Sequence, residues 1–148
     1  MGENNNVIKL AFTGSTKLTL EAMKQITRLN GFKIIGLFGL SDDRLSGKVN
    51  SVRMYKFCTE NSIVLNKTEN WDSFYAFCTE NNVDLIITLG DSRIVPKKIV
   101  NNFEVIGNHG AILPDVQGGA SLVWGRLLND GEWGISIMKI GEKVDSGD

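Results

Sequence analysis

Short apolar runs alternate with amphipathic segments along the whole chain, and this alternation restricts the fold more than any other feature. An apolar run, a polar or glycine-containing turn and a segment with 3.6-residue periodicity are typical of a strand, a turn and a helix. Strands that alternate with helices form βαβ units, whose strands lie parallel with helices on both faces of the sheet. The sequence therefore predicts an α/β fold with a Rossmann-like, open and mostly parallel sheet.

The same patterns give approximate bounds for each element. Residues 41–44 are expected as a polar loop, and Cys58 and Cys78 as buried helix residues, because a free cysteine behaves as a small hydrophobic side chain. Strands are expected at 7–12, 32–38, 63–65, 85–89, 104–107 and 135–140, and helices at 18–29, 49–58, 71–80, 97–101 and 120–128.

Length and composition narrow the class of protein. The 148 residues suit one domain, and 16 basic against 17 acidic side chains give a net charge of -1, which argues against a dedicated nucleic-acid binder. The apolar runs are too short to cross a bilayer and the first residues lack a signal peptide, so we expect a cytoplasmic protein without a membrane partner. Because the chain stops soon after an expected strand, we also expect residues 1–148 to be the N-terminal portion of a longer chain.

Loops at the carboxyl ends of the expected strands are the first places to look for a ligand site. The segment TGSTK at 13–17 has one glycine, whereas a dinucleotide-binding turn needs G-x-G-x-x-G. The segment SGKV at 46–49 lacks the spacing and the Ser or Thr of a phosphate loop. These two loops therefore argue against NAD and ATP sites.

The only histidine, His109, follows an expected strand and lies in a glycine-rich turn. Asp145 stands past the end of another expected strand, in KVDSGD. A histidine held by a carboxylate can act as an acid, a base or a hydrogen-bond donor toward a carbonyl group. The alternative is that both residues are ordinary turn residues, and spacing alone leaves the two interpretations open.

The segment that contains both residues resembles a known signature. NHGAILPDVQGGASLVWGRLLNDGEWGISIMKIGEKVDSGD, at 108–148, is similar to the core of the folate-dependent formyltransferases, which include methionyl-tRNA, glycinamide ribonucleotide and sugar N-formyltransferases. Upstream, DLIITLGDSRIVPKKIV at 84–100 is similar to the folate-loop segment of that family. Positions in register with the signature are His109, Gly110, Leu113, Pro114, Gly118 or Gly119, Gly134, Asp145 and Gly147.

The resemblance implies a formyltransferase fold, a catalytic domain at residues 1–148 and a role for each matching residue. His109 would donate to the oxyanion that develops on the formyl group of 10-formyltetrahydrofolate, the co-substrate. Asp145 would orient His109 and accept the proton of the amine through water, and Asn108 would be a second oxyanion donor. No metal is expected. The main chain around Ser92, Arg93, Ile94 and Val95 would hold the pterin of the folate.

Two positions depart from the family pattern. The catalytic asparagine of the family stands two residues before the histidine, where this chain has Gly107, and the family's serine is replaced by Ala111. Asn108 is adjacent to His109, so in an extended strand its side chain should point to the opposite face. Only a local bulge would turn the side chain of Asn108 toward a molecule bound beside His109.

The acceptor is less constrained than the reaction. The near-neutral charge disfavours tRNA, and Trp124 with the segment after it is most similar to the sugar enzymes, so a nucleotide-linked amino sugar is expected as the small-molecule acceptor. Trp124 itself is expected in the core, because apolar helix faces usually pack inward. Other acceptors, a 10-formyltetrahydrofolate hydrolase and a non-catalytic folate- or nucleotide-binding module remain alternatives. The oligomeric state is open, with a homodimer among the states allowed.

Overall fold

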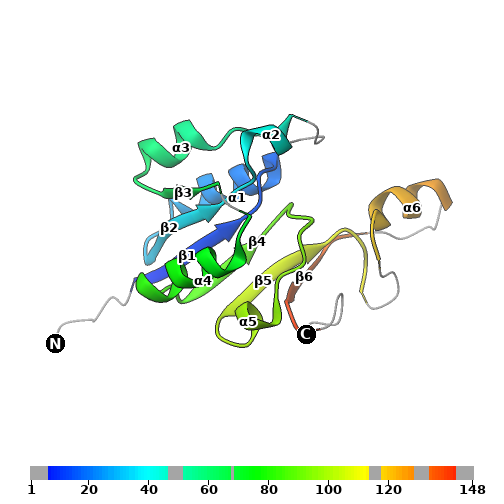
Figure 1. Ribbon diagram of the computed structural model, residues 1–148. Coiled ribbons are helices and arrows are strands. Elements are labelled where there is room, and N and C mark those ends of the chain that lie inside the picture. Colours follow the sequence, from blue (N-terminus) through cyan, green and yellow to red (C-terminus); the bar gives the residue numbers. More distant parts are fainter. Residues whose placement is uncertain (1–6, 47–51, 68, 114–117, 129–133, 143–148) are drawn as a thin grey trace.

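A single open sheet organises the computed structural model, which describes residues 7–46, 52–67, 69–113, 118–128 and 134–142 (Figure 1). The strands are β1 (Ile8–Thr13), β2 (Phe32–Phe38), β3 (Val64–Asn66), β4 (Leu85–Thr88), β5 (Glu104–His109) and β6 (Ser136–Lys139). The helices are α1 (Lys17–Ile26), α2 (Asp42–Leu45), α3 (Tyr55–Glu60), α4 (Trp71–Glu80), α5 (Lys97–Val100) and α6 (Ser121–Leu128).

The sheet has the strand order β3-β2-β1-β4-β5-β6. Neighbouring strands from β3 to β5 pair in parallel, and β6 pairs antiparallel to β5. Because strands β1 to β5 run in the same direction, their carboxyl ends lie at one edge of the sheet. The predicted α/β fold with an open, mostly parallel sheet is confirmed.

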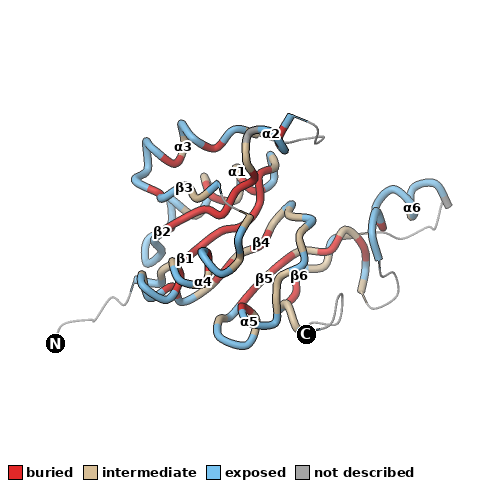
Figure 2. The backbone as a smooth tube through the Cα atoms, in the orientation of Figure 1, coloured by how far each residue is buried: buried red, intermediate tan, exposed pale blue. Residues whose placement is uncertain are grey.

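Two apolar clusters cover the two faces of the sheet. On one face, Met23 of α1 and Cys58 of α3 pack with Leu10 and Phe12 of β1. On the other, α4 and α5 pack against Ala11 of β1 and the middle of β4 and β5. Buried residues accordingly follow the strands, while the outer surfaces of the helices are exposed (Figure 2). The alternation of side chains along β1 thus fixes helices on both faces, as predicted.

The turn between β1 and α1 is fastened to the end of β4. Thr16 caps the helix with Thr19 in a reciprocal capping box, and Thr19 Oγ1 donates to the carbonyl oxygen of Leu89 at 2.6 Å. Gly14 has φ +126°, and a Cβ there would collide with the same carbonyl. The single glycine of TGSTK therefore serves close packing of two strand ends.

Apart from shifts of up to three residues at the ends of other elements, the structure differs from the expected elements in two places. Residues 42–45 form the short helix α2, in which the N–H groups of Arg44 and Leu45 both donate to Ser41 O. One turn is too short to show periodicity, which is why the polar sequence indicated a loop. The next helix begins at Tyr55 rather than near residue 49. Of the helices that the structure describes, none combines the length and apolar character needed to span a bilayer.

Both cysteines are free and buried, with exposed fractions of 1% for Cys58 and 0% for Cys78. Burial raises the pKa of the Cys58 thiol to about 11 and that of Cys78 to about 12. Because the thiolate is the nucleophile, we expect neither to react with Ellman's reagent at pH 8 in the folded protein, and both to react in guanidinium chloride. A Thr59→Cys variant, which adds an exposed thiol, should react at once. Rapid labelling of two thiols in the folded parent would contradict the assigned burial.

Candidate active site

A cavity of about 420 Å³ opens at the carboxyl ends of β4 and β5. Its walls come from four parts of the chain, namely the end of β4 with the loop 90–95, the end of β5, Gly118 with Gly119 ahead of α6, and the segment 138–142 that includes the end of β6. His109 and all four predicted folate-binding residues, Ser92 to Val95, line this one cavity. The structure thus brings together residues that stand up to 17 positions apart in the sequence.

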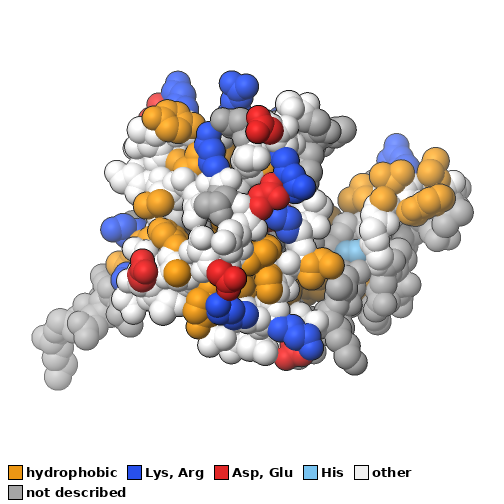
Figure 3. Space-filling model, viewed as in Figure 1, with side chains coloured by type: hydrophobic (Ala, Val, Ile, Leu, Met, Phe, Trp, Pro, Cys, Tyr) orange, Lys and Arg blue, Asp and Glu red, His pale blue; other side chains and the backbone are white. Residues whose placement is uncertain are grey.

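His109 is the last residue of β5 and is 9% exposed. It pairs across the strands with Ser136 of β6. The hydroxyl of Ser136 donates to Ala111 O at 2.8 Å and accepts from the N–H of Leu113 at 3.0 Å. One side chain of β6 therefore holds the segment that leaves His109. Only a small pale-blue patch of histidine reaches the surface in Figure 3.

Regular pairing of β5 decides which side chains share a face with His109. The register with β4 and with β6 runs without a shift, and residues 105, 107 and 109 are buried while 106 and 108 are half-buried. Gly107 and His109 therefore lie on one face, and the side chain of Asn108 lies on the other. No bulge in the described strand turns Asn108 toward His109, although Asn108 does border the cavity.

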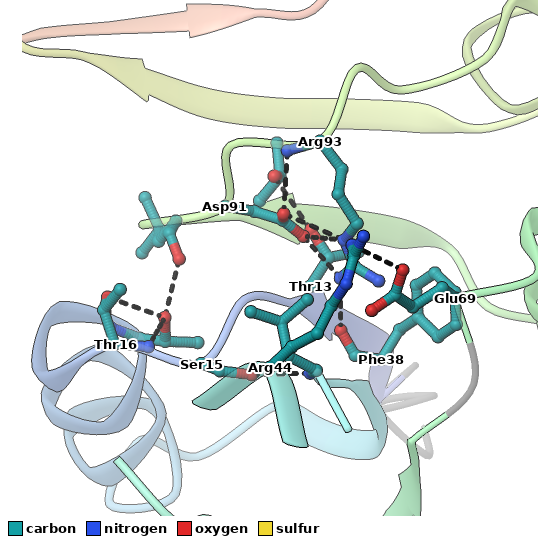
Figure 4. Close-up of polar contacts among 12 residues, drawn as sticks. Thr13, Ser15, Thr16, Phe38, Arg44, Glu69, Asp91 and Arg93 are labelled. Atoms are coloured by element: carbon teal, nitrogen blue, oxygen red, sulfur yellow. Dashed lines mark hydrogen bonds and ion pairs between the residues drawn. The ribbon is translucent and has the colours of Figure 1, made fainter. Parts of the chain in front are cut away.

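A buried ion pair fixes the loop 90–95 (Figure 4). The Asp91 carboxylate accepts from the backbone N–H of Arg93 at 3.0 Å, from its Nε at 2.9 Å and from its Nη2 at 2.6 Å. The same Nη2 donates to Phe38 O at the end of β2, 2.8 Å away. Only 1% of the Asp91 side chain and 11% of the Arg93 side chain are exposed.

Aromatic rings complete the surroundings of this ion pair. The guanidinium of Arg93 lies 4.4 Å from the centroid of Phe38 and 5.3 Å from that of Trp71, which is cation–π geometry. Because the guanidinium of Arg93 is held inside the protein, it is the main chain of Arg93 and the neighbouring loop residues that face the cavity. Ile94, at the tip of the loop, is 74% exposed.

Glu142 lines the cavity from the segment that follows β6. Lys97 of α5 lies 2.9 Å from its Oε2, and the amide of Asn101 donates to its Oε1 at 3.1 Å. The hydrogen bond from Lys97, followed by that from Asn101, lowers the pKa of this carboxyl. These contacts hold the chain after β6 against α5. Asp145, Pro114 and Gly147, which the sequence analysis singled out, lie outside the described residues.

In the parts of the chain that the structure describes, no three histidine, cysteine, aspartate or glutamate side chains lie close enough together to hold a metal ion.

Comparison with known proteins adds to this geometry. The sequence model of a family described as "Formyl transferase" matches residues 6–148. The chain belongs to the formyl transferase family. The resemblance that the sequence indicated is thereby confirmed at the level of the family.

Curated relatives of the chain include methionyl-tRNA formyltransferases. That of Mycoplasma mycoides is 26% identical over 147 residues, which are 97% of this chain and 46% of the relative. That of Latilactobacillus sakei is 37% identical over 67 residues, 44% of this chain. The chain thus spans less than half the length of the methionyl-tRNA enzyme from Mycoplasma.

Solved structures share the fold at low identity. The phosphoribosylglycinamide formyltransferase of Anaplasma phagocytophilum has a TM-score of 0.76 at 16% identity, over 95% of this chain and 68% of that one. A sugar N-formyltransferase from a Shewanella species has a TM-score of 0.69 at 14% identity, over 95% and 54% of the two chains. Because enzymes for all three acceptors are similar to this chain, similarity alone does not select one of them.

Sequence reasoning missed the ion pair and Glu142. Asp91 and Arg93 stand two residues apart in a polar loop, and the only available signal was that a carboxylate can bond the N–H two residues on. The expectation that Trp124 lies in the core is wrong, since it is 57% exposed on α6.

Replacing Asp91 by alanine should destabilise the protein by about 3–5 kcal/mol, because the guanidinium of Arg93 would stay buried without its partner. Urea denaturation measures the change. Asp72→Ala is the matched control, because its ion pair with Lys98 is exposed, and a change within error is expected. Equal stability of Asp91→Ala and the parent would show that the loop is held by something else.

Proposed function

We propose that this protein transfers a formyl group from 10-formyltetrahydrofolate to a primary amine, with residues 1–148 as the catalytic domain. The observation that carries the proposal is one cavity, lined by His109 and by the folate-loop residues, in a chain of the formyl transferase family. The cavity lies at the carboxyl ends of parallel strands, where open α/β sheets bind their ligands.

The reaction needs a hydrogen-bond donor for the developing oxyanion and a group that accepts the proton of the amine. The amine nitrogen attacks the formyl carbon, negative charge develops on the formyl oxygen, and the bond to N10 of the folate then breaks. N10 ends with a proton and the amine has lost one. A donor placed at the developing oxyanion lowers the barrier, and the buried His109 is the side chain proposed for this role.

The proton transfer from the amine is assigned to Asp145. Asp145 is proposed to orient His109 and to accept the amine proton through water. Asn108, expected from the sequence as a second donor, borders the cavity with its side chain on the face opposite His109, so only a minor contribution to stabilising the oxyanion is proposed for it. Stabilisation of the developing oxyanion would therefore depend on His109 more than on Asn108.

The folate is proposed to bind through the main chain of residues 92–95. Arg93 supports this role indirectly, since its guanidinium is held by Asp91 and by Phe38 O and so fixes the loop. Met138 and Ile140 give the cavity apolar surface, and its volume falls within the range usual for small-molecule sites. The proposed reaction uses no metal ion.

The proposed acceptor is an amine on a nucleotide-linked sugar. The net charge of -1 supports a small molecule over tRNA, whose phosphates are bound by basic surfaces. Sugar N-formyltransferases also share the fold. A cytoplasmic location is part of this proposal.

A second candidate is a folate-binding module without turnover. Gly107 favours it, because the face of β5 that carries His109 offers no side-chain amide two residues before the histidine. The two candidates agree on folate binding and differ in chemistry.

Replacing His109 by alanine should lower acceptor-dependent release of tetrahydrofolate by about 10²–10³-fold, since one oxyanion donor is lost. Folate affinity, measured by calorimetry, should change little. Asn108→Ala on the same strand is the matched comparison and should cost less. The assay uses the full-length protein with amino sugar nucleotides, glycinamide ribonucleotide and methionyl-tRNA as acceptors.

Each other outcome identifies a different function. Release without any acceptor would indicate a hydrolase. Folate binding without release, equal in the parent and in His109→Ala, would indicate the binding module and would overturn the transferase.

A further inference from the structure

Gly107 has no free space beside it on the face that carries His109. A Cβ at this position would lie 2.7 Å from Ile140 Cδ1, 3.0 Å from Thr88 Cγ2 and 3.1 Å from Ile140 Cγ1. The first distance is shorter than real Cβ atoms show, and the other two are tighter than nine in ten Cβ contacts, so a neighbouring side chain would have to move. The volume that any side chain at 107 needs is therefore already filled, mainly by Ile140.

Thr88 is held in place from the far side. Thr13 Oγ1 donates to Thr88 Oγ1 at 2.8 Å, and both residues are buried in the sheet. This bond fixes the rotamer of Thr88, because a second staggered position would leave a buried hydroxyl unpaired. The methyl group of Thr88 consequently stays directed at Gly107, so Thr88 cannot make room.

Ile140 is fixed at its backbone but not at the end of its side chain. Its N–H donates to Val105 O at 2.8 Å, which continues the pairing of the two chain segments beyond β6. The atoms nearest to Gly107 are the terminal ones, Cδ1 and Cγ1, which a shorter residue would lack. Both Gly107 and Ile140 also line the cavity.

We propose that Ile140 occupies the place of a side chain at 107 and makes the cavity wall beside His109 apolar. Gly107 and Ile140 are then exchangeable only as a pair. This inference rests on the proposed function, in which a formyl oxygen lies near His109. Beside this apolar wall, the formyl oxygen would accept a hydrogen bond from His109 and none from a side chain at position 107.

The inference predicts coupling between the two positions. Gly107→Asn alone should lower the melting temperature, because the amide must displace Ile140 against a fixed Thr88. Ile140→Ala should also lower it, by opening space in an apolar wall. In the Gly107→Asn/Ile140→Ala protein the asparagine fills that space, so its melting temperature should be no lower than that of Ile140→Ala. Independent sites would instead give the sum of the two losses.

Turnover gives the second readout. An asparagine at 107 would lie on the face of His109, so kcat for formyl transfer should be roughly 10²-fold higher in the double variant than in Ile140→Ala. Affinity for 5-formyltetrahydrofolate, a folate used as the binding probe, should differ little between those two proteins. A change in kcat without a change in binding separates an effect on the reaction from one on packing.

Ile137→Ala in β6, three residues before Ile140, is the matched control, because Ile137 is 67% exposed and pairs with Asn108. Combined with Gly107→Asn, it should leave the loss in melting temperature unrelieved. All variants are made in the full-length protein and compared by differential scanning calorimetry and by tetrahydrofolate release.

Two results would overturn the inference. One is Gly107→Asn melting at the temperature of the parent, and the other is a double variant that shows additive losses. Equal kcat in the double variant and in Ile140→Ala would overturn the effect on the reaction. Absence of tetrahydrofolate release in every protein, with coupled melting temperatures, would instead reject the proposed function and leave the steric pairing established.

Discussion

The parallel pairing of β1 with β2 on one side and with β4 on the other is the constraint on which the rest of the structure depends. It brings three strand ends to one edge, and polar contacts then join them. Thr19 Oγ1 reaches Leu89 O, Thr13 bonds Thr88, and Arg93 reaches Phe38 O. Each contact satisfies a buried polar group that would otherwise cost free energy, so the strand ends hold one another in place.

The loop that borders the cavity owes its shape to a charge pair that is expensive to bury. Taking Asp91 and Arg93 out of water costs several kcal/mol per ion, and their attraction offsets this only with good geometry. Here three donors reach one carboxylate, and the guanidinium also lies over two aromatic rings. Such a pair contributes little net stability but specifies one loop conformation, which suits a segment proposed to bind folate through its main chain.

The sequence was most informative where burial dictates the residues. The strand 32–38 and the helix 71–80 were predicted with the bounds that the structure has, because apolar periodicity reports a buried face directly. Short elements such as α2 have too few residues to show a periodic pattern. The sequence around Asp91 and Arg93 is that of an ordinary polar loop, so it gives no sign of a buried ion pair. Contacts between distant segments, such as Ser136 with Ala111 O, depend on which strands pair, and the pattern within one strand does not identify its partner.

Register also explains why the departure at Gly107 cannot be repaired within β5. Asn108 is next in sequence, yet a regular strand turns it away, and moving it onto the face of His109 would shift every neighbour to the wrong face. The space at 107 is instead controlled from the segment of β6, through the side chain of Ile140. In an open sheet, the chemistry available beside a strand-end histidine is thus decided jointly by two strands, and a change on one of them is tolerated only with a matching change on the other.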